Sequence, residues 1–156
     1  MRQLLKNKLK DQKGFTLIEL LAVIVILGII AAIAIPSILG LIKNSEKDAH
    51  VANAQQMVSS TRTAVAADDD RLPWTDTTKT SATVPLSLLV SAGYVEDFTN
   101  PSDKTSGYDT TNSKVVITKT GTTLTYTVTL VSGKQGGPTY INGIESKQLK
   151  RSSASY

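Results

Sequence analysis

One stretch of the sequence is apolar over an unusual length, and it limits how the chain can fold. It runs from Phe15 to Ile42, and Glu19 is the single charged residue within it. The run exceeds the ~18–20 residues with which a helix crosses a bilayer. The sequence therefore predicts a membrane-spanning helix near the N-terminus, with one carboxylate close to its start.

The positive charge of the chain lies in front of this apolar run. The first 14 residues contain one acid, Asp11, and five basic residues: Arg2, Lys6, Lys8, Lys10 and Lys13. From Phe15 onward 12 Lys and Arg residues face 12 Asp and Glu residues. The net charge of +4 and the pI of 9.3 therefore belong to residues 1–14. This pattern predicts a cytoplasmic N-terminus and gives no reason to infer nucleic-acid binding from the pI.

The boundary between charge and apolar run is a Gly-Phe pair, Gly14-Phe15. An ordinary secretory signal has 7–15 apolar residues followed by a small-x-small cleavage site. Here the run is longer and no such site closes it. A cut between Gly14 and Phe15 would remove residues 1–14 as a leader and leave the apolar segment on the mature chain.

The apolar helix has two expected features of its own. Pro36 lacks a backbone donor and clashes with the carbonyl four residues earlier, so a kink is expected over 32–36. Small residues make one side thin enough for another helix to approach closely; they are Gly28, Ala31, Ala32, Ala34 and Gly40.

The helix is expected to continue beyond the membrane through residues 43–67, which contain no Gly or Pro. An apolar stripe at spacings of three and four predicts one covered face; it consists of Val51, Ala54, Val58, Thr61 and Val65. Three acids, Asp68 to Asp70, then oppose the helix dipole. We expect one helix from Phe15 to Ala67, roughly 80 Å long at ~1.5 Å per residue.

The remaining residues are expected to supply the partner of that stripe. Residues 114–120 and 123–131 are β-branched, with Gly121-Thr122 as the turn between them, and predict a hairpin with one buried face. A third short strand is expected at 139–144. Residues 85–91 predict a short helix with a proline start and a stop at Gly93. Turn-rich sequence is expected at 71–83, a loop at 99–113, and a polar, mobile tail at 146–156.

Few residues offer catalytic or metal-binding chemistry. The chain has no Cys and a single His, His50, which excludes disulfides, thiolate metal sites and the usual triads; neither catalytic residues nor cofactors are expected. Asp103, Ser106 and Asp109 around Gly107 suggest a calcium site, but their spacing does not fit the known calcium loop and solvated acids are the alternative.

Three further residue groups each have an ordinary structural interpretation. His50 is expected to face solvent on the outer half of the helix. Trp74 is expected to pack over the helix. The basic cluster in the tail could contact DNA or anionic wall polymers through phosphate neutralisation, with a solvated tail as the alternative; its residues are Lys147, Lys150 and Arg151.

The segment KGFTLIELLAVIVILGIIAAIAIP resembles the N-terminal signature of type IV pilins and pseudopilins, and the resemblance covers about residues 8–60. This family implies an α+β fold in which one long N-terminal helix packs on a small antiparallel β-sheet. The first half of that helix spans the membrane, and its second half is amphipathic. The expected organisation is a leader (1–14), a transmembrane half (15–42), an amphipathic half (43–67), a globular sheet domain (68–145) and the tail (146–156).

The resemblance also implies how the chain is processed and used. A prepilin peptidase would cut between Gly14 and Phe15 and N-methylate Phe15. Glu19 would pair with the Phe15 amine of a neighbouring subunit as a homopolymer forms. The implied partners are an assembly platform protein and its ATPase, and the subunit would wait in the cytoplasmic membrane before it joins a surface filament.

Several functions remain open at this stage. The expected one is a pilus, or fimbrium, for adhesion, motility or DNA uptake. The alternatives are a pseudopilin of a competence or type II secretion system and, from another class, a signal-anchored surface binding protein that never polymerises. The missing Cys departs from the pilins that close a C-terminal loop with a disulfide, and it favours a Gram-positive pilin or a pseudopilin.

Overall fold

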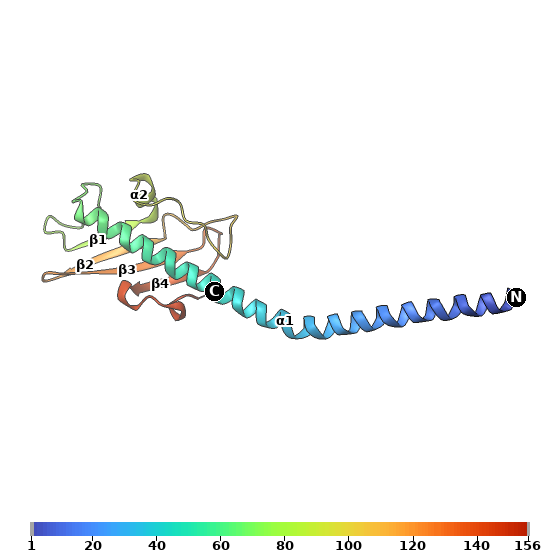
Figure 1. Ribbon diagram of the computed structural model, residues 1–156. Coiled ribbons are helices and arrows are strands. Elements are labelled where there is room, and N and C mark those ends of the chain that lie inside the picture. The colour runs from blue at the N-terminus through green and yellow to red at the C-terminus, as the bar shows by residue number, and fades with distance from the viewer. Residues whose placement is uncertain (1, 156) are drawn as a thin grey trace. The chain divides into compact units, whose positions relative to one another are not determined.

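The computed structural model describes the backbone of residues 2–155 and the side chains of residues 17–155. The chain divides into two compact units, Met1–Ile42 and Lys43–Tyr156. One helix, α1 (Arg2–Ala66), provides the whole of the first unit and the first element of the second. The remaining helices and strands all belong to the second unit (Figure 1).

Helix α1 begins earlier than expected and ends where expected. Residues 2–14 are helical as well, which agrees with their content of Leu, Lys and Gln, all good helix formers. At the other end Asp68 adopts φ +50°, its N–H donates to the Val65 carbonyl, and the Asp69 N–H donates to the Ala64 carbonyl. This pair of bonds is a Schellman motif. Pro36 lies inside the helix, and the kink expected there stays a prediction.

A four-stranded antiparallel sheet forms the other layer of the second unit, with strands in the order β1-β2-β3-β4. The expected hairpin is confirmed as β2 (Lys114–Thr120) and β3 (Thr123–Val131), with Gly121 at φ +61° in the turn. The expected third strand is β4 (Thr139–Glu145). Burial alternates along β3, where Tyr126, Val128 and Leu130 are buried.

Strand β1 (Ser81–Pro85) corrects the expectation of irregular structure up to residue 83. Ala82 pairs with Ile117 and Val84 pairs with Val115, and both β1 side chains are fully buried. The strand is too short and too rich in Ser and Thr for its pattern to stand out. Helix α2 (Leu86–Ser91) follows at once, with Pro85 at its N-cap and Gly93 at φ +76° beyond its end, as predicted.

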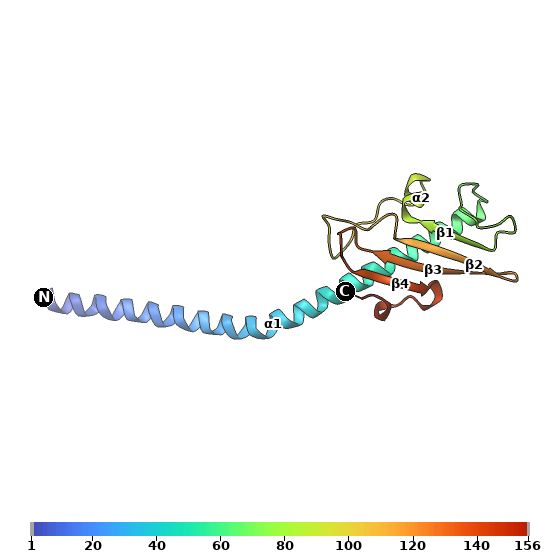
Figure 2. The same cartoon turned by 180° about the vertical axis from the view of Figure 1, so that it is seen from behind.

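The outer part of α1 lies across one face of the sheet (Figures 1 and 2), and the core forms between them. The expected stripe is confirmed: Val51, Ala54, Val58 and Thr61 are buried and Val65 is half-buried. Met57, which the stripe did not include, is also fully buried. Trp74 is half-buried against this core, as expected.

The C-terminal segment differs from the mobile tail that the sequence predicts. It forms two short 3-10 helices, η1 (Ser146–Gln148) and η2 (Arg151–Ser153). Arg151 pairs with Asp48 of α1, with 2.7 Å between Nε and Oδ1, and Ala154 is buried. The Ser155 N–H donates to the Tyr140 carbonyl. These contacts join residues far apart in the sequence, so the tail's own composition does not show them.

Candidate functional site

The first unit exposes an apolar surface that a water-soluble protein would bury. Seventeen large hydrophobic side chains of α1 between Leu17 and Ile42 are 48–73% exposed. Among residues 17–155 these are the large hydrophobic side chains that the structure leaves exposed. Burying one such side chain fully is worth about 1.5–3 kcal/mol, so covering this surface releases a free energy on the order of tens of kcal/mol. The surface therefore requires lipid or other apolar helices around it.

Length and composition make α1 capable of crossing a membrane. From Leu17 onward its most apolar window has a mean hydropathy of 3.0. Small residues leave gaps in the surface, since a Cβ placed at Gly28 or Gly40 would meet nothing within 4 Å. Such gaps permit close approach of another helix.

Glu19 is the single charged residue within this apolar surface, and its side chain is exposed among exposed Leu and Ile residues. A carboxylate within hydrocarbon is costly unless it finds a partner. Phe15 precedes Glu19 by four helical positions, a spacing that places two residues on one face. The side chain of Phe15 lies outside the residues that the structure describes, as does any contact at Gly14, so the expected cleavage and pairing stay predictions.

Within residues 17–155, no group of three His, Cys, Asp or Glu side chains comes together in a way that could hold a metal ion. The suggested calcium ligands are engaged otherwise. The Asp103 carboxylate accepts the N–H groups of Thr105 and Ser106, and Asp109 accepts those of Thr111 and Asn112. The pKa of both carboxyls lies below the ordinary value, at Asp109 chiefly through the hydrogen bond that the Asn112 side-chain amide donates and at Asp103 chiefly through the Ser106 N–H, as expected for carboxylates that accept amide hydrogen bonds.

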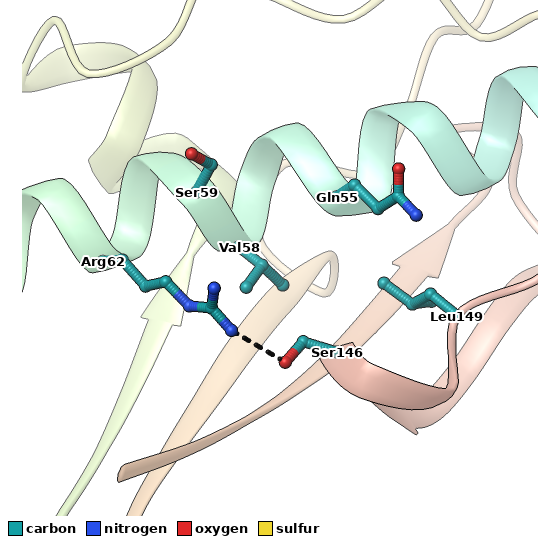
Figure 3. A pocket seen from close by; sticks show the side chains of 6 residues that line it. All are labelled: Gln55, Val58, Ser59, Arg62, Ser146 and Leu149. Atoms are coloured by element: carbon teal, nitrogen blue, oxygen red, sulfur yellow. Dashed lines mark hydrogen bonds between the residues drawn. The ribbon is translucent and has the colours of Figure 1, made fainter.

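A small hollow lies between α1 and η1 (Figure 3), lined by Gln55, Val58, Ser59, Arg62, Ser146 and Leu149. Arg62 Nη2 donates to Ser146 Oγ at 3.1 Å, and its guanidinium lies 4.9 Å from the centre of the Tyr126 ring. The Arg62–Ser146 hydrogen bond beside this hollow holds η1 on the helix, and the Arg151–Asp48 pair does the same for η2.

The three residues of the basic cluster expected in the tail are in different surroundings. Arg151 is held by Asp48, and each partner shifts the pKa of the other: that of Asp48 is lowered and that of Arg151 is raised, chiefly through their hydrogen bonds. Lys147 and Lys150 are exposed. The structure gives no additional support to a DNA or wall-polymer site here.

His50 corrects the sequence analysis most clearly, because it is completely buried instead of facing solvent. Its ring contacts Ser102, Tyr108 and Tyr140, all more than 50 positions later in the sequence. One local signal existed: His50 lies four positions before Ala54, so it continues the buried stripe toward the membrane side.

Comparison with known proteins supports the interpretation of the first unit. The family model described as the prokaryotic N-terminal methylation motif matches residues 9–35, a range that contains Gly14, Phe15 and Glu19. Two type IV major fimbrial proteins FimA from Dichelobacter nodosus are similar to the chain. One is 41% identical over 68 residues, covering 41% of this chain and 42% of the relative; the other is 46% identical over 54 residues, covering 35% of each.

Over its N-terminal part the chain is similar to type IV fimbrial proteins, and it contains the prokaryotic N-terminal methylation motif. A long apolar N-terminal helix and an antiparallel sheet, both present here, agree with the fold expected of a type IV pilin. The chain spans less than half the length of either curated relative that it matches. No solved structure matches it.

Proposed function

We propose that this chain is a structural subunit, a prepilin that is stored in the cytoplasmic membrane and then assembled into a surface filament. The observation that carries the proposal is the continuous apolar surface of α1 from Leu17 to Ile42. In the membrane lipid covers this surface. In a filament the equivalent helices of other subunits would cover it, through contacts that repeat without closing into a ring.

Processing supplies the switch between the two states. Cleavage between Gly14 and Phe15 by a prepilin peptidase removes the whole excess of positive charge and creates a new N-terminal amine, which the enzyme then methylates. Glu19 of one subunit pairs with this cation on its neighbour. In apolar surroundings the two charges are costly unless they pair. Alignments of the helices that leave them unpaired are therefore unfavourable, and the pairing selects one axial register.

The second unit forms the outside of the filament and determines what the filament contacts. Withdrawing α1 from lipid requires work, because its apolar side chains must leave the bilayer core. An assembly platform protein and an ATPase are the partners that would supply this work. The similarity to fimbrial proteins favours a pilus over a secretion pseudopilus.

The test is the substitution Glu19→Ala in cells that produce and assemble the protein. The helix should still insert, since the substitution removes an unfavourable charge from the apolar run, and cleavage should proceed. The amount of subunit in the sheared surface fraction should fall at least tenfold, while the amount in the membrane fraction should not decrease. Immunoblots of the two fractions measure both quantities.

The matched control is Leu20→Ala, which shortens a neighbouring apolar side chain without removing charge and should leave filaments at near wild-type levels. Unchanged surface material with Glu19→Ala would remove Glu19 from assembly. If the unmodified protein gave no sheared filament at all, a surface protein anchored by its signal segment would be the better description.

A further inference from the structure

The surroundings of His50 involve three separate parts of the second unit. His50 lies on α1, and its ring stacks on Tyr140 of β4 with centroids 3.9 Å apart and planes inclined by 18°. The Tyr108 ring meets it edge-on, with centroids 5.7 Å apart and planes at 75°. Tyr108 belongs to the irregular segment 99–108, which joins α2 to the sheet. His50 therefore lies between the helix, the sheet and this segment.

The hydrogen bonds of the ring define its protonation state. His50 Nδ1 lies 2.6 Å from Tyr108 Oη, and Asn53 Nδ2 donates to the same phenol oxygen at 3.1 Å. Burial raises the pKa of Tyr108 to about 12, so the phenol is protonated at neutral pH. Its oxygen already accepts from Asn53, and its O–H has Nδ1 as the acceptor within reach, so we assign the phenol as the donor to Nδ1. The other nitrogen, Nε2, then carries the hydrogen and donates to Ser102 Oγ at 3.0 Å. With a neutral imidazole, each of these donors and acceptors therefore has a hydrogen-bond partner.

A second proton on the ring breaks this arrangement. Nδ1 would become a donor pointing at the Tyr108 oxygen, and the Tyr108 O–H would lose its acceptor. An unsatisfied buried donor costs about 1–3 kcal/mol, and the ring would also carry a charge in a fully buried position. Protonation therefore opposes the contacts between His50 and segment 99–108.

The charged and titratable groups around the ring do not reverse this balance. On α1, Glu46 lies one turn before His50, and its field favours the imidazolium. Segment 99–108 and β4 present Ser102, Tyr108 and Tyr140, and the nearby Asp103 carboxylate is engaged by two amides of its own loop. The Tyr140 face offers a cation–π contact worth about 0.5–2 kcal/mol. Burial outweighs these effects and lowers the pKa of His50 to about 4.

We propose that His50 is an acid-sensitive latch, in which protonation of the buried imidazole releases segment 99–108 from α1. Four hydrogen bonds hold the segment to the helix, besides the edge-on contact of the His50 and Tyr108 rings: His50 to Ser102, His50 to Tyr108, Asn53 Nδ2 to Tyr108 Oη at 3.1 Å, and Asn53 Nδ2 to the Thr99 carbonyl at 3.3 Å. Two of the four involve the imidazole directly.

The release is local, because other bonds keep the segment's far end on the sheet. Tyr108 forms an isolated antiparallel bridge with Ser132, and the Gly133 N–H donates to the Gly107 carbonyl. The register of the β2–β3 hairpin is continuous from the Lys114–Thr129 pair to the Thr120–Thr123 pair, and none of the latch groups takes part in it. Irregular segments of this kind open at lower free energy than a sheet interior.

The pH window follows from the direction of the shift. The closed latch needs neutral His50, whose ordinary pKa of 6.5 is lowered to about 4. The open state therefore binds the proton more strongly, and the latch is fully effective above pH 6.5 and weakens as the pH falls toward 4. With these two values the equilibrium between the closed and the open latch shifts toward the open state by a factor of roughly 70 at pH 4.5 relative to pH 7.5.

The chain offers a direct measurement, because His50 is its single histidine and gives one set of imidazole signals. NMR of the full chain in micelles of a neutral detergent can follow the ring protons from pH 7.5 to 3 and the amide protection factors from pH 7.5 to 4.5. The expected result is an imidazole midpoint near pH 4 and a loss of protection by roughly 70-fold in 99–108, where exchange occurs through latch opening. The β2 and β3 amides should keep their protection.

Two variants complete the test. His50→Gln removes the titrating group and should abolish the pH dependence of the 99–108 amides between pH 6.5 and 4.5. Gln56→His, at an exposed position of the same helix, adds a reference histidine that should titrate near 6.5 and leave the latch unchanged.

Three outcomes would overturn the latch: a His50 midpoint near 6.5 in the wild type, equal loss of protection in the segment and the sheet, or no loss in the segment at all. The wild-type titration decides the matter even if His50→Gln fails to fold.

Discussion

Glu19 and His50 are ionisable residues of the same helix, and their apolar surroundings differ in kind. Glu19 is exposed among apolar side chains and has its expected partner on another subunit, whereas His50 is buried and fully partnered within its own unit. The difference decides what each can do. A carboxyl group that has no partner among the described residues favours association, and a neutral imidazole with a complete set of partners responds to pH.

At the residue scale, the sequence predicts Glu19 better than His50 for a physical reason. Glu19 interrupts an apolar run whose members are neighbours in the sequence, so the sequence alone shows it. The burial of His50 depends on Tyr108 and Ser102, with which it pairs across more than 50 residues. Local periodicity places a residue on a helix face, but it does not show how far along the helix the covering segment reaches.

Surface carboxylates should produce a second acid response, separate from that of His50. Asp76 accepts hydrogen bonds from the hydroxyl groups of Thr78 and Thr80, and these lower its pKa below the ordinary 3.8. Its contribution to stability is therefore present above pH 3.8 and is lost as the pH falls below that value.

The substitution Asp76→Asn should flatten the dependence of the free energy of unfolding on pH below 4 and leave it unchanged between pH 4 and 6.5. Urea denaturation at a series of pH values measures this, with Trp74 fluorescence as the reporter. Glu96→Gln, at an exposed position, serves as a control. An effect of Asp76→Asn confined to the range above pH 4 would contradict the assignment.

At the scale of elements, strongly periodic segments were predictable and short ones were not. The hairpin of β2 and β3 follows from the alternation of apolar and polar residues over seven residues or more. The stripe on α1 follows from apolar residues at spacings of three and four. Strand β1 has five residues and is recognisable only through its pairing with β2. The two 3-10 helices of the tail are likewise fixed by contacts with α1 and β4, which no local pattern encodes.

The packing of α1 on the sheet can be tested at Met57, which is fully buried. Met57→Ala should lower the free energy of unfolding of the second unit by about 2–5 kcal/mol, because it removes buried apolar volume and leaves a cavity. Denaturation followed through Trp74, the single tryptophan of the chain, measures the loss.

The neighbouring residue offers a matched control on the exposed side of the same turn. Gln56→Ala should change stability by no more than about 0.5 kcal/mol. Equal effects of the two substitutions would mean that this face of α1 is not packed on the sheet as described.

At the scale of the whole molecule, the two units have different requirements. The second unit has its own core between α1 and the sheet, whereas the first needs lipid or other helices to cover its side chains. All of the net charge lies in residues 1–14. A cut between Gly14 and Phe15 would therefore turn a basic membrane precursor into a nearly neutral subunit, whose new amine stands four residues before Glu19.

The N-terminal mass of the protein in sheared surface material tests this account most directly. We predict a subunit that begins with N-methylated Phe15, lacks residues 1–14 and is recovered as filaments. Tandem mass spectrometry of the N-terminal peptide identifies both the cut and the methyl group. A surface protein that retained Met1 and residues 1–14 would contradict the account, because the charged leader would then remain at the start of the apolar helix.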